Sequence, residues 1–264
     1  MLQLRDISIT FNEGTPDEKR ALQSINLSLE KGDFVTIIGS NGAGKSTLMN
    51  VISGNLIPDV GEVAINTQSV THLPEYKRAA YIGRVFQDPM AGTAPSMTIE
   101  ENLAMAYARD KKRKLRPGVT AKRKALFKEY LQTLNLGLEN RLTAKVGLLS
   151  GGERQALSLL MATFTEPNIL LLDEHTAALD PSRAELITQL TYDIVEKFEL
   201  TTLMVTHNMQ QALDLGNRLF MMDKGQVIFD VRGEEKRALT IEKLLREFQL
   251  IRGEQFESDR AVLG

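Results

Sequence analysis

Apolar residues alternate with polar ones in the first part of the chain. The apolar positions are Leu2, Leu4, Ile7, Ile9 and Phe11. A second, strict alternation covers residues 25–29, and the polar residues 12–19 between the two favour a loop. Alternation with period two is typical of strands that bury one face. We therefore expect two half-buried strands of an antiparallel sheet.

Other runs are apolar or β-branched throughout, which is typical of buried strands in a parallel sheet. They are Phe34–Ile38, Ile169–Leu172 and Leu203–Thr206. Shorter strands are expected at Glu62–Ile65, after a turn over Pro58–Gly61, at Tyr81–Phe86 and at Gln226–Asp230. Helical stretches follow several of these strands. Strands that alternate with helices predict an α/β fold.

Two helices interrupt this alternation in the middle of the chain. Thr98, with Glu101 three residues later, forms a capping box that opens a helix through about Ala108. A second helix is expected over residues 120–134. We therefore predict a separate helical lobe at about residues 88–149.

The composition is that of an ordinary globular protein: 264 residues, 42% hydrophobic and 25% charged. There is no cysteine, which excludes disulfides and thiolate metal sites. Apolar runs such as residues 169–172 are far shorter than the ~20 residues needed to cross a bilayer. The beginning of the chain lacks a basic region followed by an apolar one. We expect a cytoplasmic protein.

The formal net charge of −2 is unevenly distributed. Residues 109–124 carry nine Lys or Arg against Asp110 alone, so this segment is +8 and the remainder is −10. The segment is interpreted as a solvated surface, as a contact with an anionic membrane face or membrane partner, or as a nucleic-acid contact. No aromatic residue interleaves the charges to provide a stacking surface. We therefore do not expect nucleic acid as a partner.

Residues 39–46, GSNGAGKS, fit the phosphate-binding pattern G-x-x-x-x-G-K-[S/T]. They join a predicted strand to a predicted helix that ends at Gly54, a context that argues against a chance glycine-rich turn. Glycines allow backbone N–H groups to surround a phosphate at the helix N-terminus. Lys45 would reach the β- and γ-phosphates of ATP, and Ser46 would bind Mg²⁺. The predicted nucleotide-binding residues here are Gly39, Ser40, Asn41, Gly42, Ala43, Gly44, Lys45, Ser46 and Thr47.

Polar residues follow the other buried strands, at the edge where ligands bind in such sheets. We expect Asp173 to hold Mg²⁺ through a water and Glu174 to polarise the water that attacks the γ-phosphate. Gln87 would touch the metal or this water, and His207 would sense the γ-phosphate, although a structural histidine is also possible. Phe11 is either a core residue or an exposed ring that stacks on adenine.

Ser150, Gly151 and Gly152 precede an apolar helix and form a second candidate anion site. Asp180 is expected to cap the next helix, with Pro181 at its first position. One chain therefore holds two phosphate-binding devices, although a single ATP does not need both on one protomer.

With these motifs in view, the chain resembles the ATP-binding subunit of an ABC transporter. Residues 39–46 match the Walker A motif of that family, Gln87 its Q-loop, residues 149–155 its signature, residues 169–174 its Walker B, residues 178–180 its D-loop and His207 its switch histidine. The resemblance implies a P-loop NTPase, a RecA-like core with an antiparallel β subdomain and a helical subdomain, over residues 1–230. Residues 231–264 would be a C-terminal helix, at about 241–248, and a tail.

The resemblance also resolves the puzzle of two phosphate sites. In this family two subunits pair head to tail, so that the signature of one covers the ATP on the Walker A of the other. Ser150, Gly151, Gly152 and Asp180 would thus contact nucleotide across a homodimer. Closure around ATP and opening after hydrolysis would drive a membrane permease, placing the subunit peripherally on the inner face of the membrane.

Two departures from the family pattern are His175, where proline is usual, and Phe11, where tyrosine is frequent. Together with residues 84–89 and 92–95 they resemble a bacterial importer subgroup with branched-chain-amino-acid-type permeases and a lipoprotein-like binding protein. Some members carry aromatic amino acids. We therefore expect uptake of a small solute such as an amino acid.

There are three alternatives to an importer ATPase. They are an ABC exporter ATPase, a soluble ABC ATPase that acts on nucleic acid or ribosomes, and a nucleotide sensor that binds ATP without hydrolysing it. Chromosome-organising relatives need a coiled coil longer than the residues between Walker A and signature allow, and translation-type relatives carry two cassettes. The presence of Glu174 and His207 argues against the sensor.

Overall fold

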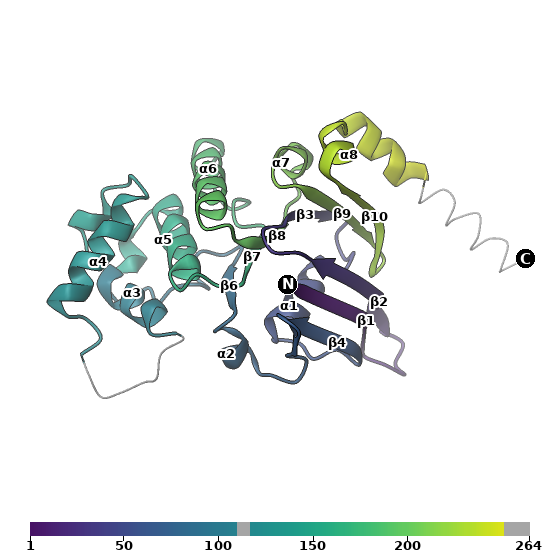
Figure 1. Cartoon of the computed structure of the whole chain (residues 1–264), viewed down its shortest axis with the longest axis horizontal. Helices are drawn as coiled ribbons and strands as arrows, with labels where there is room; N and C mark the ends of the chain where they lie inside the picture. Colours follow the sequence, from purple (N-terminus) through teal and green to yellow (C-terminus); the bar gives the residue numbers. More distant parts are fainter. Residues whose placement is uncertain (110–116, 251–264) are drawn as a thin grey trace, which may run out of the picture.

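The computed structural model describes residues 1–109 and 117–250, and its strands form two sheets (Figure 1). The first is antiparallel, in the order β2-β1-β4-β5. Its strands are β1 (Leu2–Phe11), β2 (Lys19–Leu29), β4 (Val60–Ile65) and β5 (Gln68–Ser69). The predicted antiparallel pair at the start of the chain is confirmed, with Leu2 opposite Leu29.

Strand β4 begins earlier than the sequence indicated, so the turn predicted over residues 58–61 is wrong in its second half. Val60 pairs with Ser8 of β1, beyond an irregularity in the register of the two strands. Gly61 has a φ of 103° and lies against the backbone of Arg5 and Asp6. Pairing with a distant strand therefore extends β4 through residues that, taken locally, favour a turn.

The second sheet has the order β10-β9-β3-β8-β7-β6. Its strands are β3 (Phe34–Gly39), β6 (Ile82–Val85), β7 (Ile169–Asp173), β8 (Thr201–Val205), β9 (Arg218–Asp223) and β10 (Gln226–Arg232). All neighbours pair in parallel except β9 and β10. The predicted buried parallel strands are confirmed, and β10 extends two residues beyond its predicted end.

The helices that carry the predicted motifs begin where the sequence indicated. Thr98 forms a capping box with Glu101, and Asp180 caps a helix with Pro181 at its first turn. The helices are α1 (Lys45–Ser53), α2 (Glu75–Arg78), α3 (Ile99–Tyr107), α4 (Ala121–Gln132), α5 (Gly151–Thr163), α6 (Pro181–Lys197), α7 (Met209–Asp214) and α8 (Gly233–Arg237), with residues 241–250 also helical.

The parallel sheet separates two hydrophobic clusters because successive side chains of a strand point to opposite faces. In β7, Ile169 and Leu171 pack with α1 and the antiparallel sheet, whereas Leu170 and Leu172 pack with the helical side of the molecule. Figure 1 shows α1 between the two sheets and α5, α6 and α7 on the opposite side of the parallel sheet. A third cluster joins α7, β9, β10 and Leu244.

Helices α3 and α4 lie at one end of the molecule, beyond α5 (Figure 1). The rings of Tyr107 and Phe127 both contact Phe164 at the end of α5, with edge-to-face geometry. These aromatic contacts join the two helices to the rest of the fold. The boundaries given above for a helical lobe and for a division at residue 230 stay predictions.

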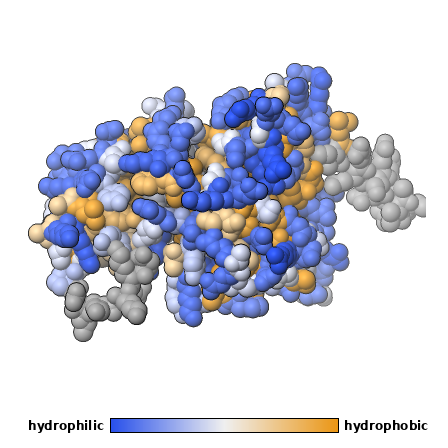
Figure 2. Space-filling view, in the orientation of Figure 1, coloured by the Kyte–Doolittle hydropathy of each residue, from blue (hydrophilic) through white to orange (hydrophobic). Residues whose placement is uncertain are grey.

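Hydrophilic residues cover most of the face shown in Figure 2, with smaller hydrophobic areas between them. Within the described ranges, no helix has the length and apolar character required to traverse a membrane. Residues 110–116 of the basic segment lie outside the described residues, so its three interpretations stay open.

Candidate functional site

The phosphate-binding loop connects β3 to α1 and is held by the backbone on either side. Gly39 has a φ of 155°, and a Cβ there would overlap the carbonyl oxygen of Met222. Gly44, with φ 101°, is packed against the carbonyl of Ala21 in β2. Both positions therefore require glycine, for lack of space as well as for backbone conformation.

Lys45 is buried at the start of α1 and folds back over the loop. Its Nζ donates hydrogen bonds to the carbonyl oxygens of Gly39, at 2.8 Å, and Ser40, at 3.0 Å. Burial lowers the pKa of Lys45, and the carboxylates of Glu174 and Asp173 oppose this shift. The ammonium group is thus already located inside the loop, surrounded by oxygen atoms, where a phosphate would replace them.

The end of β9 and the turn that follows it hold the phosphate-binding loop by two hydrogen bonds. Ser40 Oγ donates to Asp223 Oδ1 at 2.8 Å, and the Gly225 N–H donates to the carbonyl of Ala43 at 3.0 Å. Asp223 is almost completely buried. No pattern near the loop indicates this support, because it comes from a strand more than 180 residues away.

A hollow beside the loop brings together most of the predicted nucleotide-binding residues. It is lined by Phe11, Lys19, Ala21, Asn41, Gly42, Ala43, Gly44, Lys45, Ser46, Thr47, Glu174 and His207. Phe11 is 36% exposed at the end of β1, so the alternative of a core residue is wrong. Lys19 was missed because the sequence pattern placed it in the loop over residues 12–19; in the structure it begins β2 and pairs with Phe11.

Glu174 and His207 are in contact at the mouth of this hollow. Their strands, β7 and β8, are parallel neighbours, so their carboxyl ends meet at one edge of the sheet. The Nε2 of His207 lies 2.5 Å from Glu174 Oε1, and the two side chains are 47% and 12% exposed. Glu174 has a φ of 47°, and its N–H donates to the carbonyl of Val205. Its carboxylate is therefore fixed by its own backbone and by the imidazole.

Asp173 and Gln87 are not among the residues that line the hollow. Asp173 forms an ion pair with Arg84, with 3.2 Å between Oδ2 and Nη2. Gln87 is exposed two residues beyond β6, and its side chain makes no hydrogen bond within residues 1–109 and 117–250. The structure thus places Asp173 next to Glu174, but it does not bring Gln87 to the loop.

Ser46 and Asp173 each have an oxygen atom that no described residue engages and that could therefore bind Mg²⁺ or its water. Ser46 is exposed at the first turn of α1, and its hydroxyl has no hydrogen-bond partner in the described chain. The Oδ1 atom of Asp173 likewise accepts no hydrogen bond from a described residue, whereas Oδ2 is engaged. Hard oxygen ligands of this kind, completed by phosphate and water, suit Mg²⁺. The residues present therefore fit the ion.

The candidate anion site at residues 150–152 lies at the N-terminus of α5. Ser150 Oγ accepts a hydrogen bond from the Glu153 N–H, and the Ser150 N–H donates one to Glu153 Oε2 at 2.7 Å. Leu179, just before Asp180, packs against Gly151. The signature and the segment before α6 are thus neighbours. Neither lines the hollow at the loop of the same chain.

His175 is not a surface residue. It is 2% exposed, and its Nε2 lies 3.0 Å from the Thr191 hydroxyl on α6. The Thr191 hydroxyl also bonds the carbonyl of Ile187. Burial lowers the pKa of His175 to about 4. We therefore assign it to the contact between β7 and α6.

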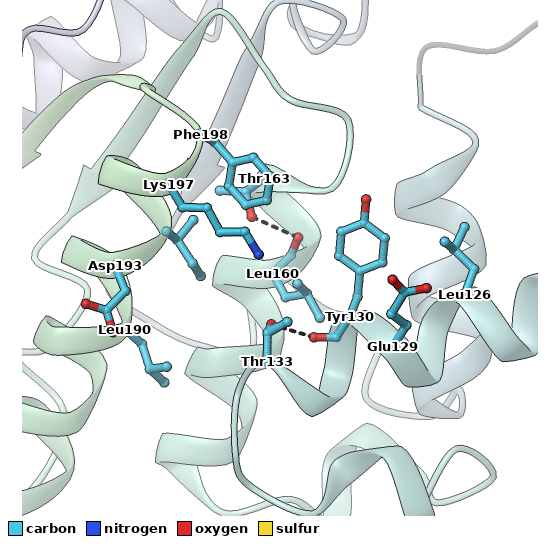
Figure 3. Close-up of a pocket in the computed structure, with 11 residues that line it drawn as sticks. Leu126, Glu129, Tyr130, Thr133, Leu160, Thr163, Leu190, Asp193, Lys197 and Phe198 are labelled. Atoms are coloured by element: carbon cyan, nitrogen blue, oxygen red, sulfur yellow. Dashed lines mark hydrogen bonds between the residues drawn. The ribbon is translucent and has the colours of Figure 1, made fainter.

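A groove of ≈ 400 Å³ lies between α4, α5 and α6, away from the loop (Figure 3). Leu160, Tyr130 and Phe198 supply its apolar walls. Two of its hydroxyl groups are used within their own helices, since Thr133 donates to the Tyr130 carbonyl and Thr163 to that of Leu160 (Figure 3). It contains none of the predicted site residues.

Comparison with known proteins agrees with this arrangement. The profile of the ABC transporter family matches residues 22–177. A tyrosine transport ATP-binding protein of Clostridioides difficile is 44% identical over 249 residues, which cover 94% of this chain and 99% of that protein. A xylose/arabinose import ATP-binding protein of Sulfolobus acidocaldarius is 30% identical over 95% of both chains.

Solved structures give the same result. A dimeric ATP-binding cassette in a post-hydrolysis state, bound to ADP and Pi, superposes with a TM-score of 0.76 at 30% identity, covering 88% of this chain and 98% of the other. A second cassette, in its ADP conformation, has a TM-score of 0.76 at 30% identity and covers 94% of this chain and 98% of that one. The fold is that of a P-loop NTPase with additional β and helical parts, and the chain belongs to the ABC transporter family as one of its ATP-hydrolysing, ATP-binding proteins.

Proposed function

We propose that this chain powers an ABC importer for an amino acid, with tyrosine or a related aromatic amino acid as cargo. The observation that carries the proposal is the contact of Glu174 with His207 beside the loop that holds Lys45. It supplies a carboxylate base next to a phosphate site, which an importer ATPase needs and a nucleotide sensor does not. The cargo rests on the likeness to the tyrosine transport protein.

In this proposal the loop residues bind the phosphates of ATP, and Lys45 exchanges its two carbonyl contacts for phosphate oxygens. Phe11 stacks on adenine from the end of β1. Ser46 and Asp173 would hold Mg²⁺, and Gln87 would touch the ion or the attacking water. When bound, this ion would neutralise charge on the β- and γ-phosphates. Glu174 accepts the proton of the attacking water, and His207 keeps the carboxylate oriented and contacts the γ-phosphate.

ATP binding in this proposal joins two copies of the chain. Ser150, Gly151 and Gly152 lie outside the hollow of their own chain, so a second copy has to present them to the loop. A related cassette has been solved as a dimer with ADP and Pi, which supports this arrangement. Asp180 lies next to the signature and would contact the nucleotide across the same interface.

The dimer would act on an integral membrane permease, at the inner face of the membrane, together with an extracytoplasmic substrate-binding protein. No helix within residues 1–109 and 117–250 is long and apolar enough to span the membrane itself. The permease would respond to closure and opening of the dimer.

The test of this function is uptake of labelled amino acids by cells of the host. A strain that lacks the chain should lose uptake of tyrosine, and the wild-type chain should restore it, whereas the Glu174→Gln variant should not. Labelled xylose serves as the parallel measurement, because a relative imports this sugar. Unchanged tyrosine uptake in the deletion strain would contradict the cargo. Affinity purification from detergent-solubilised membranes then identifies the permease, and recovery of ribosomal or DNA-associated proteins in its place would contradict the transport role.

A further inference from the structure

The side chain of Arg84 contacts Asp173, helix α1 and the ring of Phe86. It lies in β6, opposite Leu171 of β7, with its side chain 12% exposed. One guanidinium nitrogen, Nη2, contacts Asp173 Oδ2 at 3.2 Å. The other, Nη1, donates to Asn50 Oδ1 at 2.8 Å and to Ser53 Oγ at 3.2 Å, both on α1.

The position of the guanidinium group is fixed from several sides. Asn50 and Ser53 are one turn apart on α1, so they hold it from the same helix face. The guanidinium carbon, Cζ, lies over the ring of Phe86, 4.7 Å from the ring centroid. Phe86 directly precedes Gln87. Only arginine offers separate donors in a rigid planar fork for the helix and the carboxylate; a lysine ammonium group would have to choose between them.

We propose that Arg84 is a positioning residue for Asp173, setting this carboxylate relative to α1 and so to Ser46 at the beginning of that helix. The inference rests on the metal-binding role proposed above for Asp173 and Ser46. Arg84 engages Oδ2 and leaves Oδ1 for a water on the metal ion. Because the same guanidinium group is bound to α1, Asp173 and Ser46 are kept at one separation before the ion arrives.

Removal of Arg84 would change the affinity for the metal ion through two effects of opposite sign. The direction of the measured change in affinity therefore shows which effect is larger. A positive charge near a cation site weakens cation binding, so removal of Arg84 would strengthen it if charge alone mattered. Removal also releases the Asp173 carboxylate from its orientation, which weakens binding. Loss of a partner that orients a metal ligand typically costs 10–100-fold in affinity. We expect the second effect to be larger.

The test measures binding of Mn²⁺, by its electron paramagnetic resonance signal, to the full-length protein saturated with ADP. The Arg84→Met variant, which removes the guanidinium group and keeps an unbranched apolar side chain, should bind Mn²⁺ about tenfold more weakly. Its affinity for ADP in EDTA should stay unchanged. Arg84→Lys should recover part of the loss, and Asn50→Ala, which removes one anchor on α1, should show a smaller loss.

Arg218→Met is the matched control. Arg218 is also a strand arginine that lies over a phenylalanine ring and pairs with an aspartate, in this case Phe220 and Asp230, away from the hollow. This variant should bind Mn²⁺ like the wild type. Unchanged or tighter Mn²⁺ binding by Arg84→Met would overturn the proposal, as would an equal loss of ADP affinity in EDTA or an equal effect of Arg218→Met.

Asp173→Asn distinguishes failure of this inference from failure of the proposed metal site. If Asp173→Asn binds Mn²⁺ normally, the assignment of Asp173 as a metal-site residue is wrong and the role of Arg84 falls with it. If Asp173→Asn loses Mn²⁺ binding while Arg84→Met and Asn50→Ala do not, only the positioning role is wrong.

Discussion

Gln155 on α5 donates a hydrogen bond from Nε2 to the carbonyl oxygen of Phe86, at 3.2 Å. Gln155 is completely buried, and α5 begins at the signature. Phe86 directly precedes Gln87. The bond therefore joins the helix that carries one candidate phosphate site to the segment expected to touch the metal ion at the other.

Replacement of Gln155 by leucine should loosen this connection. The Phe86 carbonyl would be left without its partner, at a cost of about 1–3 kcal/mol in the free energy of unfolding. Since Gln155 Oε1 is itself buried without a partner, its removal offsets part of this cost, and the lower end of the range is expected. Urea unfolding of the two proteins measures the difference. Thr133→Ala, which removes an exposed hydroxyl directly after α4, is the control and should have little effect.

Replacement of Glu174 by glutamine should stop turnover while leaving ATP bound. The amide keeps the shape of the side chain but accepts no proton, so the ATPase rate should fall at least about a hundredfold. Size-exclusion chromatography with light scattering should detect a dimer that persists with ATP. A variant that hydrolyses ATP at the wild-type rate would show that Glu174 is not the base.

Replacement of Ser150 by arginine should prevent ATP-dependent dimerisation without removing the ATP site of the monomer. The residue lies at the N-terminus of α5, outside the hollow, so bulk and charge there should affect nucleotide contacts only across the interface, while loss of the cap on α5 lowers the free energy of unfolding by about 1 kcal/mol. Nucleotide affinity is measured by calorimetry and association by light scattering. If both are lost together, the idea that the site is shared between two copies is contradicted.

Lys236 should make the stability of the protein depend on pH in the alkaline range. It is buried on α8, where Nζ donates to the carbonyls of Leu215 and Gly216 at the end of α7. Burial lowers the pKa of Lys236 to about 8 from 10.5, and the charge of Asp214 opposes this shift. Between these values the unfolded chain retains the proton and the folded chain does not, so the contribution of Lys236 to stability rises with pH.

The measurement compares the free energy of urea unfolding of the wild type and Lys236→Met near the two ends of this pH window. The methionine variant loses the hydrogen bonds to α7 at every pH and should be less stable throughout. Its deficit should grow as the pH rises. A deficit that shrinks with pH would mean that folding does not lower the pKa of Lys236.

The local features of this chain follow from its sequence because they are made by neighbouring residues. The capping box predicted at Thr98 closes within four residues and is present, and the structure shows a second one of the same span at Ser150. The phosphate-binding loop is recognisable for the same reason, since its glycines and Lys45 form one continuous segment. Glu174 and His207 could be placed together because the carboxyl ends of adjacent parallel strands meet at one edge of the sheet.

Contacts between distant segments were decided only by the tertiary structure. The pairs Arg84–Asp173 and Ser40–Asp223 join residues 89 and 183 positions apart. Arg78 is fully buried and donates from Nη1 to the carbonyls of Val51 and Ile52 at the end of α1, a role that nothing near it indicates. The sequence by itself determined the family, the loop and the polar ends of the strands, because short-range backbone geometry encodes them. Packing of the sheets and helices decided which side chains hold those groups in place, because such partners are selected by proximity in space and leave no periodic pattern along the chain.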